Sequence, residues 1–305
     1  MKTLWVDELD PAQLKAVRNL LLAARDADGW PAVTATGPLP GEFTGGPHLL
    51  GYAEDGAGDL VGYGHLDETG DAFGRQVAEL IVHPAHRKRG YGARLFGALA
   101  TRAGPALRVW SHSDHPSAAA LAASSGFERV RELLIMSADT AALKLDSVAM
   151  PPGVRLRTFE PGADEAAMIA VNARAFSWHP EQGALTADDL LAAEGEDWFE
   201  PAGFFVAEDQ DGRLLGFHWT KVHPPVNEGA GEAVGEVYVV GVDPGAQGGG
   251  LGKALTVAGL RHLRAKGLPR VILYVEGDNA PAIAVYTRLG FSTVSTAVQY
   301  ERVIG

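Results

Sequence analysis

The stretch Gly235-Glu-Val-Tyr-Val-Val-Gly-Val-Asp-Pro-Gly-Ala-Gln-Gly-Gly-Gly-Leu-Gly-Lys253 decides how this chain folds. Its first half is rich in β-branched valine and predicts a buried strand. Asp243-Pro244-Gly245 then turns the chain, and Gln247–Lys253 opens a predicted helix. Backbone N–H groups at a helix start are unpaired and point outward, and the helix dipole adds positive charge there. The stretch therefore predicts a cradle for a pyrophosphate group.

The spacing of the glycines separates this loop from the two common nucleotide-binding loops. A Walker A loop would need a glycine at Gln247 and a Ser or Thr at Ala254. A dinucleotide fingerprint that starts at Gly250 would need a glycine at Leu255. The pattern Gln-x-x-Gly-x-Gly, met by Gln247, Gly250 and Gly252, resembles the acyl-CoA loop of the GNAT N-acetyltransferases. Taken alone, the loop is better explained as an ordinary glycine-rich turn between a strand and a helix.

The same layout occurs a second time, earlier in the chain. Leu80–Ala93 contains a strand end followed by Arg87-x-x-Gly90-x-Gly92. A strand hairpin precedes each copy, and a helix that ends in Gly-Phe follows each copy, at Gly126-Phe127 and at Gly290-Phe291. Three landmarks in the same order indicate an internal duplication of roughly 150 residues, which is the size of one domain.

The duplication divides the 305 residues into two predicted domains. Residues 1–138 form the first domain and residues 154–305 the second. Residues 139–153 form a linker, in which Pro151-Pro152-Gly153 interrupts regular structure. Strands and helices alternate in both copies. We therefore predict an α/β fold with a mixed (α+β) sheet, repeated as two tandem GNAT domains.

The composition limits the classes of function. The net charge is −12, and Arg87-Lys88-Arg89 is the one basic block, which argues against nucleic-acid and anionic-membrane partners. The chain has no cysteine, which excludes disulfides, thiolate metal sites and cysteine nucleophiles and suits a reducing cytosol. Histidines and carboxylates lack the spacing of metal ligands, so we expect no metal. We expect neither a signal peptide nor a membrane span.

The two copies differ where acyl transfer would need chemistry. Moving an acetyl group from a thioester to an amine needs a base for the amine proton, and the departing thiolate benefits from an acid. Counting back from the loop places Gln76 opposite Glu236. Counting back from Gly-Phe places Ala122 opposite Tyr286. We therefore predict that the second copy is catalytic and that the first binds cofactor without reacting.

These side chains also have purely structural explanations. Glu236 alone could be a solvated residue on an exposed strand, Tyr286 could fill the core, and Lys221 could be a solvated strand end. Aligning the hairpins places Lys221 opposite Asp67. The joint occurrence around one loop favours a functional role, more for Glu236 and Tyr286 than for Lys221. The ten histidines form no evident cluster, and we assign them to structure or surface.

Longer motifs of the second copy resemble the mycothiol synthase family. These motifs are Asn172-x-Arg-Ala-Phe-x-Trp-His-Pro-Glu181-Gln, Gly216-Phe-His-Trp-Thr-Lys221, Glu236–Pro244 and Leu273-Tyr-Val-Glu-x-Asp-Asn279. The resemblance covers nearly the whole chain. It implies tandem GNAT domains that acetylate the cysteinyl amine of Cys-GlcN-Ins (desacetylmycothiol) with acetyl-CoA, in the cytoplasm of actinobacteria.

The resemblance also implies roles for individual residues. Glu236 would be the general base and Tyr286 the general acid, and backbone N–H groups near Val240 and Val242 would stabilise the oxyanion where the strand splays from its neighbour. The acceptor would contact Glu42, Glu181, Lys221, Glu236 and Tyr274. Acetyl-CoA would contact Val240, Gly241, Val242, Gln247, Gly248, Gly249, Gly250, Leu251, Gly252, Lys253, Asn279, Ala280, Pro281, Ala282, Ile283 and Ala284. A second acetyl-CoA would contact Leu80, Ile81, Val82, Lys88, Arg89, Gly90, Tyr91, Gly92 and Ala93.

Two features depart from the family. Gln247-Gly248-Gly249-Gly250 lacks the basic residues that the family has in the middle of this loop, so phosphate binding would rely more on backbone N–H groups. Glu42 lies in the long segment Gly29–Gly46, which is hard to align.

Two other functions stay open. The chain could be a tandem GNAT enzyme for another amine, such as an aminoglycoside or a peptide, or a non-catalytic acyl-CoA sensor. We expect a monomer, whose partner is a small pseudodisaccharide amine and neither a nucleic acid nor a membrane.

Overall fold

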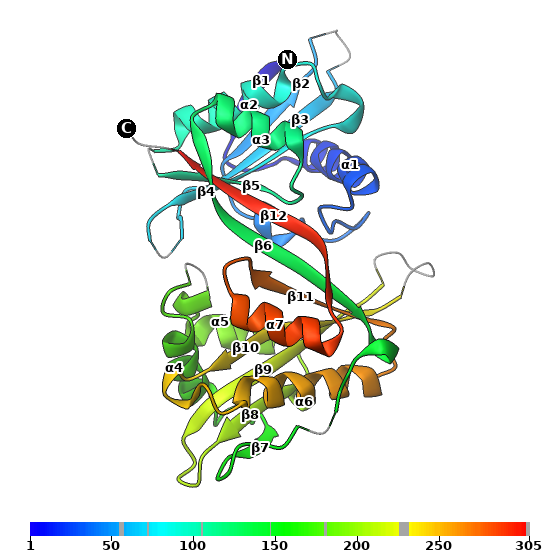
Figure 1. The fold of residues 1–305 in the computed structure, drawn as a ribbon. Helices are drawn as coiled ribbons and strands as arrows, with labels where there is room; N and C mark the ends of the chain where they lie inside the picture. Colours follow the sequence, from blue (N-terminus) through cyan, green and yellow to red (C-terminus); the bar gives the residue numbers. More distant parts are fainter. Residues whose placement is uncertain are drawn as a thin grey trace. The chain divides into compact units, whose positions relative to one another are not determined.

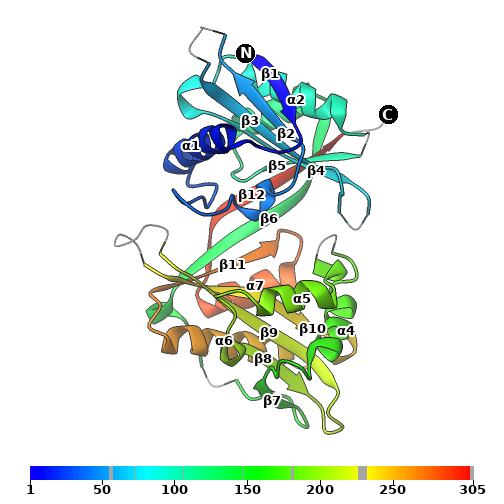
Figure 2. The same cartoon turned by 180° about the vertical axis from the view of Figure 1, so that it is seen from behind.

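The computed structural model describes residues 1–54, 58–71, 73–104, 106–146, 148–179, 182–225 and 232–302. The chain folds into two compact units, which Figures 1 and 2 show from opposite sides. Unit 1 contains Met1–Leu133 together with the chain from Ser295 onward, and unit 2 contains Leu134–Val294. Each unit has a mixed sheet with helices on both faces, which confirms the predicted fold class.

Unit 1 has the strand order β1-β2-β3-β4-β5-β12. Neighbouring strands are antiparallel except β4 and β5, which are parallel. The elements of the first repeat are β1 (Lys2–Val6), α1 (Pro11–Asp28), η1 (Gly41–Phe43), β2 (His48–Tyr52), β3 (Leu60–Asp67), β4 (Gln76–Val82), η2 (Pro84–His86), α2 (Tyr91–Arg102), β5 (Leu107–Ser111), α3 (Pro116–Ser124) and β6 (Phe127–Asp139).

Unit 2 repeats this plan with the strand order β6-β11-β10-β9-β8-β7, in which β10 and β11 are parallel. The elements of the second repeat are η3 (Thr140–Ala142), β7 (Arg155–Thr158), α4 (Glu165–Ala175), η4 (Gln182–Ala184), α5 (Ala187–Glu194), η5 (Pro201–Gly203), β8 (Phe204–Glu208), β9 (Leu214–His223), β10 (Val234–Val242), η6 (Pro244–Ala246), α6 (Leu251–Ala265), β11 (Arg270–Glu276), α7 (Ala280–Leu289) and β12 (Ser292–Arg302).

Each sheet is covered by different helices on its two faces. In unit 1, α1 packs on the face that carries Tyr63 and Ile81, and α2 and α3 pack on the opposite face. In unit 2, α4 and α5 pack on the face that carries Phe217 and Trp219. The opposite face carries Val237 and is covered by α6 and α7, which lie toward the viewer in Figure 1. Alternation of side chains along each strand separates the two cores.

Local signals explain where several helices begin. Asp10 caps α1 with a capping box, and Pro11 is the first residue of the helix. Thr186 forms a capping box at the start of α5. The side chain of Asn279 accepts a hydrogen bond from a backbone N–H in the first turn of α7. These capping residues explain where α1, α5 and α7 begin.

The last strand of each repeat contributes to the sheet of the other unit. β12 pairs antiparallel with β5, from Val298 opposite Ser111 to Glu301 opposite Arg108. The side chain of Val298 is fully buried in the core of unit 1. β6 is the neighbour of β11 in the strand order, and its residue Met136 lies in the core of unit 2. The two units therefore exchange their last strands.

Residues 139–153, predicted as a linker, belong to unit 2. The backbone N–H of Thr140 donates to the carbonyl of Pro269 at 3.0 Å, and that of Lys144 donates to the carbonyl of Leu289 at 3.0 Å. Leu143 is buried in the same core. The units in the structure therefore end at other residues than the predicted boundaries of 138 and 154. The reason is that the predicted linker forms backbone hydrogen bonds with unit 2 and packs in its core. Among the described residues, no helix has the length and apolar character to cross a membrane.

Candidate active site

Both glycine loops enter their helices in the same conformation. The residues that precede α2 and α6 are Gly90 and Gly250, with φ angles of 78° and 83°. Because glycine offers no capping side chain, the first N–H groups of each helix stay available to a ligand. The first residue of each loop also braces the preceding strand. Nε of Arg87 donates to the carbonyl of Val82 at 3.1 Å, and Nε2 of Gln247 donates to that of Val242 at 3.3 Å.

The second loop position explains one departure from the family. Lys88 has a φ angle of 60°, the left-handed region that costs a side-chain-bearing residue about 1–2 kcal/mol. Gly248 occupies the same position two residues before the helix cap in unit 2 and has a φ angle of 88°. Glycine removes that cost. At this position the loop of unit 2 therefore lacks the cation that Lys88 supplies in unit 1, but its backbone is unstrained.

In each unit, the strand before the loop parts from its parallel neighbour. β10 pairs with β11 from Val234 to Val237, whereas its pairing with β9 continues to Val242. In unit 1, β4 pairs with β5 only from Gln76 to Ala78. Beyond these points the described strands are paired on one side only, so Val239–Val242 have no strand partner on the side of β11. We call this separation of β10 from β11 the gap. This gap matches the expected splay.

Glu236 lies at the edge of the gap in unit 2. It pairs with Lys221 of β9 and with Ile272 of β11, one residue before the ladder ends. Its side chain is buried, and Oε2 lies 2.5 Å from Nε2 of His223. Since adjacent strand residues point to opposite faces, Glu236 projects away from the core that contains Val237.

Aromatic rings surround the cation beside Glu236. Nζ of Lys221 lies 4.1 Å from the ring centroid of Trp198 and 5.1 Å from that of Tyr238. The pKa of Tyr238 is raised by burial and by the negative charge of Glu236. Lys221 therefore contributes positive charge to this face while its stem packs against apolar surface.

Tyr286 lies on the other face of the sheet. It lies in α7, is 9% exposed and packs in the same core as Val237. Burial raises the pKa of its hydroxyl to about 12, so this phenol stays protonated and can donate a proton. Glu236 and Tyr286 project to opposite faces of the sheet.

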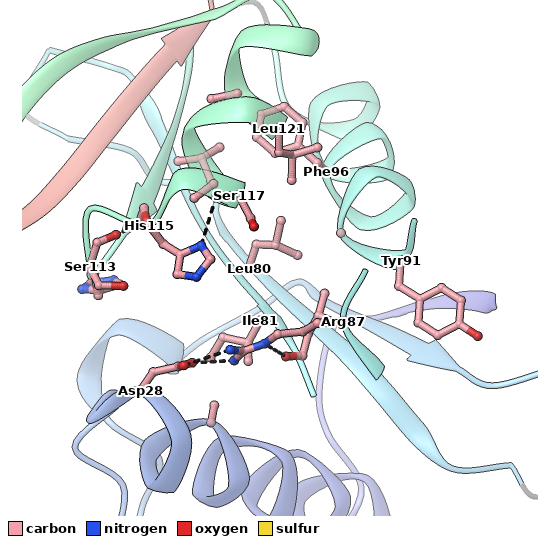
Figure 3. Close-up of a pocket in the computed structure, with 18 of the residues that line it drawn as sticks. Asp28, Leu80, Ile81, Arg87, Tyr91, Phe96, Ser113, His115, Ser117 and Leu121 are labelled. Atoms are coloured by element: carbon pink, nitrogen blue, oxygen red, sulfur yellow. Dashed lines mark hydrogen bonds and ion pairs between the residues drawn. The ribbon is translucent and has the colours of Figure 1, made fainter. Parts of the chain in front are cut away.

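Unit 1 contains a cavity of about 780 Å³ beside its glycine loop. Figure 3 shows the guanidinium of Arg87 facing the carboxylate of Asp28, with which it forms a two-point ion pair. Of the nine residues predicted to hold the second cofactor, eight line the cavity, and Arg89 does not. The eight are Leu80, Ile81, Val82, Lys88, Gly90, Tyr91, Gly92 and Ala93.

Two family models and several full-length relatives match this chain. The model of the acetyltransferase (GNAT) family matches residues 170–291, and a second model, the acetyltransferase (GNAT) domain, matches residues 47–129. The chain is 62% identical to a mycothiol acetyltransferase of Saccharomonospora viridis over 98% of both chains. It is 59% identical to a mycothiol acetyltransferase of Amycolatopsis mediterranei, again over 98% of both.

The chain belongs to the mycothiol acetyltransferase family. It is an acetyl-CoA-dependent N-acetyltransferase with two GNAT domains. A solved tandem GNAT protein from the clavulanic acid biosynthesis pathway superposes with a TM-score of 0.68 over 100% of both chains, at 20% identity. That likeness concerns the fold alone, and it confirms the tandem arrangement.

The acceptor contacts expected for this mycothiol acetyltransferase family member fall into three groups. Lys221 and Glu236 are opposite each other, and Tyr274 lies two residues beyond Ile272 on β11, so all three share one face of the sheet. Glu42 lies in η1 of unit 1, where burial raises the pKa of its carboxyl group. Glu181 lies outside the described residues.

The motif Asn172–Gln182 has a structural role in unit 2. The fully buried side chain of Asn172 donates to the carbonyl of Gln182 at 2.6 Å and accepts from its side-chain amide at 3.0 Å. Nε of Arg174 donates to the carboxylate of Asp243 at 2.7 Å. A backbone hydrogen bond from Gly245 and the ion pair with Arg174 hold the pKa of Asp243 below its usual range. The motif thereby fixes the turn before the glycine loop.

The predicted alignment of Gln76 with Glu236 is wrong by one residue. Val82 pairs with Gly62 and Val242 pairs with Gly216, which makes the two hairpins equivalent. Counting from these pairs, the partner of Asp67 is Val77, just as the partner of Lys221 is Glu236. β10 contains a bulge between Val237 and Val239, so Tyr238 is an extra residue that a count along the sequence cannot detect.

Val77 is therefore the residue of unit 1 that stands where Glu236 stands in unit 2. Its apolar side chain cannot accept a proton. The amide of Gln76 instead accepts a hydrogen bond from the backbone N–H of Gly104 at 3.1 Å, which is a structural role. The predicted pairs of Asp67 with Lys221 and of Ala122 with Tyr286 keep their equivalent positions.

Sequence reasoning missed two pairs in which a buried carboxylate contacts an imidazole. Glu79 is buried on β4, and its Oε2 lies 2.8 Å from Nε2 of His112, which stacks on Trp30 with ring centroids 3.7 Å apart. The pair of His223 with Glu236 is the other. A charged residue within an apolar strand was the available signal for Glu79. No sequence pattern links either histidine to its carboxylate, since the partners lie on different segments.

Proposed function

We propose that this enzyme acetylates the cysteinyl amine of Cys-GlcN-Ins with acetyl-CoA, giving mycothiol and CoA. The relatives' names support this acceptor. The observation that carries the mechanism is the buried carboxylate of Glu236 beside the gap between β10 and β11. In the proposed reaction, the amine nitrogen bonds to the acetyl carbon and Glu236 receives its proton. The carbon–sulfur bond breaks, and Tyr286 protonates the departing thiolate.

The backbone of unit 2 would hold the acetyl-CoA. Its pantetheine arm would lie along Val240–Val242, where β10 has a strand partner on one side only. Its pyrophosphate would accept hydrogen bonds from the loop Gln247–Lys253, and the start of α7 at Asn279–Ala284 would complete the site. Backbone N–H groups in the gap would stabilise the oxyanion that forms on the acetyl group.

The face around Glu236 has the polarity that the acceptor needs. The acceptor carries an ammonium group and many hydroxyls, and carboxylates can bind both. Glu236, Lys221 and Tyr274 share this face, and we include Glu42 and Glu181 among the contacts because the family resemblance implies them. The cytoplasmic location and a monomeric state are part of the same proposal.

A second acetyl-CoA would occupy the cavity of unit 1 without reacting. The cavity of about 780 Å³ contains eight of the nine expected contact residues, including the loop Gly90–Ala93. Val77 and Ala122 stand at the positions of the base and the acid, and neither side chain exchanges a proton. Unit 1 would therefore hold its cofactor as a structural or regulatory ligand.

The pH profiles of two variants test the catalytic pair. Glu236→Gln removes the base, so kcat/KM for Cys-GlcN-Ins should fall by about 10²–10⁴-fold, and most at low pH where the amine is protonated. Raising the pH supplies neutral amine and should partly restore this variant. Tyr286→Phe slows thiolate departure, and high pH should not restore it in the same way. Small, equal and pH-independent losses in both variants would show that these residues only shape the pocket.

Thiol release separates the proposal from its alternatives. Acetyl-CoA should release CoA rapidly with Cys-GlcN-Ins and slowly with aminoglycosides or peptides. Fast release with another amine would support a different acceptor, and no release with any amine would support an acyl-CoA sensor.

The assignment of the units has its own test. Glu79→Gln should leave turnover unchanged, because the proposed base and acid both lie in unit 2. If Glu79→Gln lost turnover while Glu236→Gln kept it, unit 1 and not unit 2 would be the catalytic unit.

A further inference from the structure

The base candidate of unit 2 has an imidazole partner. Nε2 of His223 lies 2.5 Å from Oε2 of Glu236, which is within hydrogen-bond distance. His223 is the last residue of β9 and lies two residues from Lys221, so both side chains project to the face of Glu236. Oε2 of the carboxylate is therefore in direct contact with the imidazole.

The two partners differ in their access to water. The side chain of Glu236 is 8% exposed, whereas that of His223 is 39% exposed. The imidazole is therefore the better placed of the two groups to exchange a proton with water. The imidazole has a second nitrogen, Nδ1, through which a proton can leave while another arrives at Nε2.

We infer that His223 is a proton relay for Glu236, an inference that rests on the proposed function of Glu236 as the base. As the amine nitrogen bonds to the acetyl carbon, its proton passes to Glu236. The Nδ1–H tautomer of His223 accepts that proton at Nε2, which regenerates the carboxylate and forms an imidazolium. The imidazolium then releases its Nδ1 proton to water, and proton exchange with water returns the imidazole to the Nδ1–H tautomer.

The neighbours of Glu236 on the adjoining strands differ in whether they can accept a proton. Lys221 stands opposite Glu236 on β9 and presents an ammonium to the same face. Tyr238 is the nearest acid on β10, and burial together with the charge of Glu236 raises its pKa, so it stays neutral. On β11 the partner of Glu236 is Ile272, which does not ionise. His223 is therefore the group in this set that can accept the proton.

Two substitutions of His223 separate a relay from a simple hydrogen-bond donor. His223→Gln keeps an N–H donor but cannot pass a proton, and His223→Ala removes the side chain and leaves space. We expect kcat/KM to fall in both by up to roughly 10²-fold, the lower end for an acid–base group. Added imidazole should restore His223→Ala, by entering the space, but not His223→Gln. The KM for acetyl-CoA should not change.

The matched control is His262, which lies 3.4 Å from Glu200 in the same unit. His262→Ala creates a similar loss of an imidazole beside a carboxylate, and imidazole should not change its rate. Wild-type activity in His223→Gln, or a slow His223→Ala that imidazole fails to restore, would overturn the relay.

A double variant distinguishes failure of the relay from failure of the base. If His223 acts through Glu236, Glu236→Gln with His223→Ala should be as slow as Glu236→Gln alone. Additive losses would overturn the relay while leaving the base in place. Full activity in Glu236→Gln would instead overturn the proposed function itself.

Discussion

At the scale of single residues, burial decides which proton each side chain of the site can exchange. Tyr286 is 9% exposed in the core beneath the gap, and its pKa rises to about 12. A phenol in this environment keeps its proton, and so stays neutral, throughout the physiological pH range. Glu236 is also buried, with Lys221 opposite it on β9 and His223 in hydrogen-bond contact.

The raised pKa of Tyr286 predicts a stability effect in alkali. The folded value is above the unfolded value of 10.0, so the contribution is fully present below pH 10.0 and is lost as the pH rises toward about 12. Tyr286→Phe cannot ionise. Between about pH 9 and pH 12, the unfolding free energy of wild type should fall by roughly 2–3 kcal/mol more than that of the variant.

Urea unfolding at a series of pH values measures this difference. Tyr63 also has a raised pKa through burial, but it is present in both proteins and cancels in the comparison. Parallel alkaline curves for the two proteins would mean that the hydroxyl of Tyr286 is solvated in the folded state.

At the scale of elements, the bulge in β10 distinguishes the second repeat from the first. Tyr238 is the extra residue between Val237 and Val239, whereas the pairing of β4 with β3 is regular from Val77 to Val82. A bulge bends its strand and redirects the neighbouring side chains. It lies between Glu236 and the backbone that faces the gap, so it sets how the base is aimed.

Deleting Tyr238 should give β10 the regular ladder that β4 already has. Val237 and Val239 would keep their partners and their faces, so the protein should fold with little loss of stability. The strand beside Glu236 would straighten, and a displacement of about 1 Å at a catalytic group can cost about 10²-fold in rate. Tyr238→Ala, which keeps the bulge, should lose less. Measurement of kcat with thermal unfolding of both variants checks this, and an active deletion variant would show that the bulge does not aim the base.

At the scale of the whole molecule, the exchange of strands couples the stability of one repeat to residues of the other. Val298 belongs to the second repeat in sequence, but it is fully buried in the core of unit 1 with Leu107 and Val109. Met136 belongs to the first repeat and is buried in the core of unit 2. Neither repeat has a complete sheet without the strand of the other.

Val298→Ala should therefore weaken unit 1. Loss of two buried methyl groups should lower the free energy of unfolding by about 1–3 kcal/mol. Hydrogen exchange should accelerate first in β5, the partner strand of β12. The control Leu273→Ala, buried in β11, should accelerate exchange in unit 2 instead. Faster exchange confined to unit 2 in Val298→Ala would contradict the observed pairing.

The sequence by itself determined the repeats, the order of strands and helices, and the glycine loops. These features depend on local patterns: valine-rich strands, caps such as Asp10 and Asn279, and glycines at Gly90 and Gly250 where the backbone needs a positive φ angle. Comparison of the two repeats also singled out Glu236 and Tyr286, because the first repeat has side chains without acid–base chemistry at the equivalent positions.

Only the tertiary structure decided which strands pair and which side chains meet. β6 and β12 have similar strand patterns, and the choice of β5 or β11 as neighbour depends on long-range packing that no local window contains. The bulge at Tyr238 shifted the true counterpart of Glu236 from Gln76 to Val77, since an inserted residue is visible only against its partner strand. The contact of His223 with Glu236 arises from the antiparallel register of β9 and β10, which brings residues of separate strands within hydrogen-bond distance.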